Sequence, residues 1–142
     1  MATLWAQTVT FDSIEIGDRL PVIIKWETAE TIERYNGILL AQDPDAPDDA
    51  EISETLDPRM LDDYVKESLL KGFPPSSIEN PASQIDIKIL EEIEAEDILS
   101  IEGIVTGKSI EGSTSIVDCS VVIERQDKTV VANASARLAL GA

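Results

Sequence analysis

The clearest pattern of apolar and polar positions lies between residues 57 and 72. The residues that would share its apolar side recur at three- and four-residue spacing: Leu61, Tyr64, Val65, Ser68 and Leu69. Asp57 can cap the first helical turn, and Pro58 suits the first helical position, where its missing N–H costs nothing. Gly72 favours a helix end, and the two prolines that follow shortly after cannot continue the helix. The pattern predicts one amphipathic helix over about residues 57–71.

Most of the remaining chain has patterns typical of strands. Apolar and charged residues alternate strictly over residues 85–89, which predicts a half-buried strand. Apolar runs between turn-forming residues predict four further strands, over residues 20–26, 98–106, 114–125 and 129–140. A loop is predicted over residues 107–112. The short turns between the last three favour an antiparallel meander. Thr28 is a candidate N-cap for a second helix over residues 29–40.

This order of elements predicts an α+β fold, in which an antiparallel sheet clasps the helix at 57–71. The 142 residues contain no internal repeat and no long Gly/Ser linker, so we predict a single domain over residues 1–142. No apolar run approaches the ~20 residues that span a bilayer, and the N-terminus lacks a signal-like pattern, which predicts a cytoplasmic protein. Cys119 is the only cysteine and lies in an apolar strand pattern, so we expect a core side chain.

The segment from Asp43 to Glu54 differs sharply from its surroundings. It carries six carboxylates, two prolines and no basic residue, a composition that predicts a solvated loop. Asp43, Asp45 and Glu54 match the first, third and twelfth positions of a calcium-binding loop. Pro47 and Asp48, however, stand where a ligand and the turn glycine belong. We therefore predict no metal site.

The charge balance narrows the range of partners. The chain has 28 acidic and 11 basic residues, a net charge of −17, and no histidine. This charge repels both a phosphate backbone and an anionic lipid surface, so neither nucleic acid nor a membrane is an expected partner. Without histidine, acid–base chemistry falls to carboxylates, hydroxyls and the few lysines and arginines.

Several segments together are similar to one known family. They are Phe11–Asp18 ahead of the first long strand, the helix at 28–40 with Tyr35 and then Asp43, the strand 85–90 followed by Glu96 and Asp97, and the closing strand 129–140. In this arrangement the chain resembles the MaoC-like hotdog proteins, which include (R)-specific enoyl-CoA hydratases and 3-hydroxyacyl dehydratases. The resemblance covers nearly the whole chain through short motifs, and it implies a hotdog fold and no cofactor.

The resemblance also implies candidate catalytic residues. In hydratases of this family, an Asp and a His five residues later flank the reacting water. Asp43 matches the Asp, but Asp48 stands in place of the His. The two carboxylates would have to share a proton to act as base and acid. In a solvated loop, both would instead stay ionised at neutral pH.

The family polarises the thioester carbonyl with an amide at the N-terminus of its central helix, usually after a His-Gly pair. Leu56 and Asp57 occupy this region here, so they are the candidate thioester contacts. As a cap, Asp57 would itself use some of these amides. Lys108 is the candidate CoA contact, and Lys88 and Arg125 are further basic residues that could contact CoA phosphates. Isolated basic residues near turns are, however, more often ordinary solvated surface residues.

Three functional hypotheses follow. The first is a catalytically depleted or accessory subunit that binds an acyl-CoA thioester, as a homodimer or as a heterodimer with a histidine-bearing hotdog paralogue. The second is an active enoyl-CoA hydratase or 3-hydroxyacyl dehydratase that uses Asp43 and Asp48. The third is a hotdog acyl-CoA thioesterase, since related hotdog enzymes hydrolyse thioesters with a carboxylate and no histidine. We favour the first, because the acid–base histidine is missing.

Overall fold

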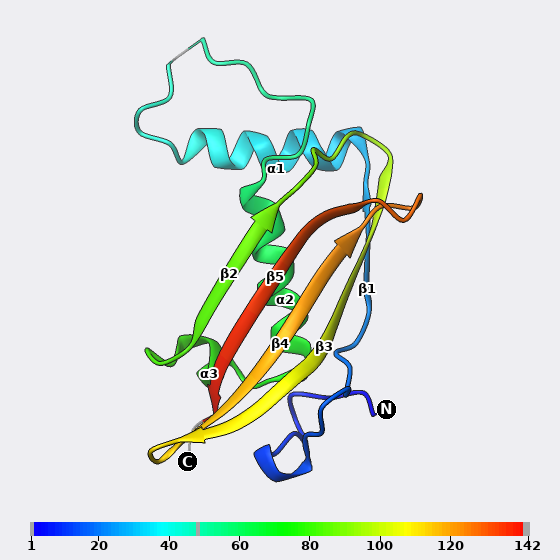
Figure 1. Cartoon of the computed structure of the whole chain (residues 1–142). Coiled ribbons are helices and arrows are strands. Elements are labelled where there is room, and N and C mark those ends of the chain that lie inside the picture. The colour runs from blue at the N-terminus through cyan, green and yellow to red at the C-terminus, as the bar shows by residue number, and fades with distance from the viewer. Residues whose placement is uncertain (1, 48, 141–142) are drawn as a thin grey trace.

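The computed structural model describes residues 2–47 and 49–140. A five-stranded antiparallel sheet lies against a central helix, α2 (Arg59–Gly72), as Figure 1 shows. The strand order is β1-β3-β4-β5-β2, and every neighbouring pair is antiparallel. The strands are β1 (Ile23–Glu27), β2 (Gln84–Ile89), β3 (Asp97–Glu111), β4 (Thr114–Glu124) and β5 (Val130–Leu140). The predicted α+β fold class, the central helix and the antiparallel meander of the last three strands are confirmed.

The core forms where the sheet meets α2. Alternate residues of the three long strands are buried on this side: Leu99, Ile101, Val105, Val117, Cys119, Val121, Ile123, Ala132, Ala134, Ala136 and Leu138. The apolar stripe of α2 supplies Leu61, Tyr64, Val65 and Leu69 to the same cluster. Cys119 is a core side chain, as predicted, and burial raises the pKa of its thiol to about 12.

Helix α1 (Ala29–Ala41) crosses one end of the sheet close to the start of α2, and the acidic loop extends beyond it (Figure 1). Thr28 caps this helix as predicted, because its side chain accepts a hydrogen bond from the Thr31 amide at 3.1 Å. In its described residues, the loop from 43 to 54 contains no helix or strand, in agreement with the sequence. None of the helices in the described part of the chain has the length and apolar character needed to cross a bilayer.

Three features of the fold differ from the sequence prediction. β1 begins at Ile23 rather than at residue 20, because Pro21 has no N–H to continue the ladder. The predicted loop at 107–112 is wrong: β3 continues to Glu111, with a register shift near Gly107 and a turn at Gly112, whose φ is +63°. Glycine in a strand here marks a bulge rather than a strand end. A short helix, α3 (Pro75–Glu79), also follows α2.

Candidate functional site

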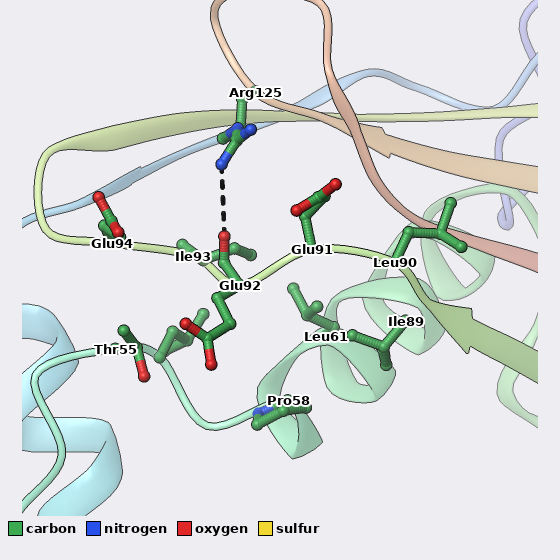
Figure 2. A pocket seen from close by; sticks show the side chains of 11 residues that line it. Thr55, Pro58, Leu61, Ile89, Leu90, Glu91, Glu92, Ile93, Glu94 and Arg125 are labelled. Atoms are coloured by element: carbon green, nitrogen blue, oxygen red, sulfur yellow. Dashed lines mark hydrogen bonds between the residues drawn. The ribbon is translucent and has the colours of Figure 1, made fainter.

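Two pockets flank the segment that leads into α2, and Thr55, Leu56 and Pro58 line both of them. The loop-side pocket, about 220 Å³ in volume, lies between α1, the acidic loop and this segment. The strand-side pocket, about 480 Å³, lies between this segment, residues 89–94 and Arg125 (Figure 2). The segment from residue 55 to 58 therefore forms a wall that both pockets share.

A buried asparagine on α1 holds this wall in place. Asn36 is 6% exposed. Its amide nitrogen donates to the carbonyl oxygens of Ser53 at 3.0 Å and Thr55 at 2.6 Å. Its Oδ1 accepts a hydrogen bond from the Asp57 amide at 2.9 Å. The Asn36 side chain thus fixes both ends of the segment. Both N–H donors and one acceptor position of its amide group are used.

The backbone amides of the wall are all occupied. From Thr55 to Leu61, each residue other than proline donates its amide within the chain. The acceptors, in chain order, are Ser53 Oγ, Ile93 O, Asn36 Oδ1, Asp57 Oδ1, Asp57 O and Pro58 O. An amide that already donates to a protein oxygen is not available to a thioester carbonyl without rearrangement. In this structure the amides at the start of α2 therefore have no free N–H to offer a thioester oxyanion.

The predicted cap is placed one residue later in the structure: Pro58 is the N-cap of α2 and provides no side-chain cap, while Asp57 adds negative charge just before it. Its Oδ1 accepts from the Arg59 amide at 2.9 Å, and its Oδ2 lies 2.8 Å from Arg59 Nη2. Hydrogen bonds from the Arg59 side chain lower the pKa of Asp57. The carboxylate is thus ionised at neutral pH and competes with any ligand oxygen for the same donors.

The predicted site residues are only partly brought together. Asp43, Leu56 and Asp57 line the loop-side pocket. Asp43 is exposed, and its Oδ1 accepts from the Asp45 amide at 2.9 Å. Asp48 lies outside the described residues, so the proposed pair of Asp43 and Asp48 stays a prediction. Asp43 therefore belongs to the lining of the loop-side pocket as an exposed side chain.

Lys108 lines neither pocket. Its ammonium donates to the Ile14 carbonyl at 2.9 Å and lies 4.4 Å from the centroid of the Phe11 ring. These contacts tie β3 to the N-terminal segment, which gives Lys108 a structural role. Lys88 is exposed on β2, and Arg125 lies beside the strand-side pocket.

Asn36 is a residue of this site that was not predicted from the sequence. A signal was present: Asn36 follows Ile32 by four residues and Tyr35 by one, so it falls on the face of the predicted helix that carries apolar residues. A polar residue in such a position needs hydrogen-bond partners when it is buried. Its partners come from residues 53–57, which no local pattern connects to α1.

The fold is similar to that of several solved structures. The MaoC-like dehydratase from Rhodospirillum rubrum has a TM-score of 0.70 and 16% identity, covering 94% of this chain and 97% of that chain. The (R)-hydratase PhaJ1 from Pseudomonas aeruginosa has a TM-score of 0.66 and 11% identity, covering 90% and 83%. A chain of the ChsH1–ChsH2 complex from Mycobacterium tuberculosis has a TM-score of 0.61 and 15% identity, covering 89% and 98%.

No protein-family model and no curated protein sequence matches this chain. The structural likenesses concern the fold: this chain has the hotdog fold that MaoC-like dehydratases and (R)-hydratases also have.

Proposed function

We propose that this chain is a MaoC-like hotdog protein that binds an acyl-CoA thioester and is catalytically depleted, acting as an accessory subunit. The fold supports the class of ligand, since the similar structures include dehydratases and hydratases. The sequence supports the loss of activity, because it has no histidine. The observation that carries the proposal is the set of occupied amides between Thr55 and Leu61.

Hydration of an enoyl thioester needs three things: a base, an acid, and donors for the developing oxyanion. Asp43 is exposed, and its Oδ1 already accepts a hydrogen bond from the Asp45 amide. The amides that would face the carbonyl donate to Asn36, Asp57 and Ile93 instead. A paralogue with a histidine would supply the missing chemistry in a mixed assembly.

Two assays on the purified chain test this proposal. We expect crotonyl-CoA and hexanoyl-CoA to bind in calorimetry, with no hydration of crotonyl-CoA above the buffer rate. Asp43→Asn should leave binding and the absence of turnover unchanged. If the wild-type chain hydrated crotonyl-CoA and either Asp43→Asn or Asp48→Asn abolished this activity, the chain would instead be an active hydratase that uses the two carboxylates. Release of free thiol from acyl-CoA would establish the thioesterase, and the absence of any binding would refute an acyl-CoA role.

Assembly is part of the proposal. The sheet has two edge strands, β1 and β2, and an open edge must be covered or paired. β2 suits pairing with a second copy, because antiparallel pairing about Ile87 would place Asp86 opposite the second copy's Lys88. Antiparallel pairing of two β1 strands about their central residue would place Lys25 of one copy beside Lys25 of the other, which brings like charges together. We therefore propose a dimer through β2, either with itself or with a hotdog paralogue.

A further inference from the structure

Arg125 has more hydrogen-bond donors than partners, although its side chain is only 23% exposed. Its Nη1 donates to the Glu92 carbonyl at a long 3.5 Å, and its Nε lies 3.7 Å from a carboxylate oxygen of Asp127. The Nε is buried and makes no hydrogen bond within the described structure. A guanidinium carries five N–H donors, so most of them are unused. The Nε itself is closed to solvent, so an acceptor on a ligand would be reached by the terminal Nη groups.

The strand-side pocket combines this donor with an apolar surface. Ile89 and Leu90 line it and are 39% and 42% exposed, so they supply its accessible apolar surface, while Leu56 and Leu61 in the same lining are almost fully buried. Figure 2 shows Arg125 reaching toward the Glu92 carbonyl, with Leu90 farther along the segment and with Leu61 and Ile89 across the segment from Arg125 in this view. At about 480 Å³, the pocket is large enough for a short acyl chain. The pocket therefore suits a chain that is mainly apolar and carries one hydrogen-bond acceptor.

The charge of the lining restricts that acceptor. Glu91, Glu92 and Glu94 are exposed members of the lining, and Arg125 is its one base among the described residues. Three carboxylates against one guanidinium leave the pocket negative, so a phosphate or a carboxylate on the ligand would be repelled. An uncharged oxygen avoids this repulsion and still accepts a hydrogen bond from the guanidinium.

We propose that Arg125 is a specificity-determining residue of the strand-side pocket, donating to an uncharged oxygen on an acyl chain whose apolar part lies over Ile89 and Leu90. This inference rests on the proposed binding of acyl thioesters and adds which acyl groups are selected. Arg125 is then a contact to the acyl chain rather than to the CoA phosphates.

Three acyl-CoA probes of equal chain length test it: hexanoyl-CoA, 5-oxohexanoyl-CoA and adipoyl-CoA, which ends in a carboxylate. With the wild-type chain, calorimetry should give a Kd for the keto compound about tenfold lower than for hexanoyl-CoA, as expected for one hydrogen bond to a charged donor. Adipoyl-CoA should bind more weakly than the keto compound. Arg125→Met should remove the keto preference while hexanoyl-CoA still binds, and the control Arg34→Met, at an exposed position on α1, should keep the preference.

The outcomes separate the two proposals. Equal Kd values for hexanoyl- and 5-oxohexanoyl-CoA would overturn the role of Arg125 and leave acyl-thioester binding intact. If adipoyl-CoA bound most tightly of the three, the argument from charge would be overturned. If Arg125→Met still preferred the keto compound, another residue would be responsible for that preference. No binding of any probe would refute the proposed function together with this inference. Because the comparison among ligands uses the wild-type chain, it holds even if Arg125→Met folds poorly, and Arg125→Lys provides a second variant.

Discussion

The Tyr64 hydroxyl donates a hydrogen bond of 2.5 Å to Glu27 Oε1 in the interior of the protein. The pair joins the end of β1 to α2, and the two residues are 1% and 3% exposed. The second carboxylate oxygen, Oε2, is buried and has no hydrogen-bond partner within the described structure. Lys25 lies 5.2 Å from the centroid of the Tyr64 ring and pairs with Glu67 at 3.0 Å. A buried carboxylate with a single hydrogen-bond donor from the protein is costly to ionise.

Glu27 should make stability fall as pH rises. Burial raises the pKa of Glu27 above its ordinary value, and only the hydrogen bond from Tyr64 and the charge of Lys25 oppose this. The folded state therefore holds the proton more tightly than the unfolded state. The resulting stabilisation is complete below the unfolded pKa and is lost as pH rises through the folded pKa. We expect the melting temperature of the wild type, relative to Glu27→Gln, to decline over that interval.

Two further variants make this measurement specific. Glu102→Gln removes the same charge at an exposed position on β3, and its melting temperature should follow that of the wild type across the pH range. Tyr64→Phe leaves both oxygens of Glu27 without a donor and should lower the free energy of unfolding by about 1–3 kcal/mol. Parallel pH curves for the wild type and Glu27→Gln would show that Glu27 does not hold its proton in the fold.

Asn36→Ala should destabilise the wall between the two pockets. The substitution removes hydrogen bonds to the Ser53 and Thr55 carbonyls and to the Asp57 amide. Unpaired buried groups cost about 1–3 kcal/mol, so we expect a loss of that order in urea denaturation. Hydrogen exchange should rise first at residues 53–57. Asn133→Ala, at an exposed position on β5, is the matched control and should change stability little. An unchanged exchange rate at residues 53–57 after Asn36→Ala would show that the wall holds without this clamp.

The elements predicted well are those with strong periodicity. The stripe of Leu61, Val65 and Leu69 encodes α2, and strict alternation encodes β2, because both patterns reflect the burial of one face. Residues buried by long-range pairing were missed. Glu27 breaks the pattern of β1 as a charged residue on its inward face, and its partner Tyr64 lies 37 positions away. No local pattern identifies such a partner, and the same holds for the contacts of Asn36.

The acidic surface should make stability depend on salt. With 28 acidic and 11 basic residues, repulsion within the chain opposes the compact state, and ions shorten its range to about 8 Å at physiological strength. The melting temperature should rise with sodium chloride. Replacing Asp45, Asp49 and Glu51 of the acidic loop with their amides should reduce this slope. A flat or falling curve for the wild type would mean that its acids are dispersed well enough not to repel.

Pairing through β2 should depend on the charges of Asp86 and Lys88. Both are exposed on this edge strand, and antiparallel pairing about Ile87 sets each opposite the other in the second copy. Asp86→Lys alone or Lys88→Asp alone would place like charges face to face on both sides of the axis, which destabilises cross-strand pairs. The double variant restores opposite charges.

Light scattering at micromolar concentration, in salt that screens the net charge, should therefore give a dimer for the wild type, a shift toward monomer for each single variant, and recovery for the double variant. Dimers that persist in both single variants would place the interface elsewhere, with the edge of β1 as the next strand to test. A monomeric wild type would rule out the homodimer and direct the search to a hotdog paralogue, whose matching edge should then carry the complementary charges.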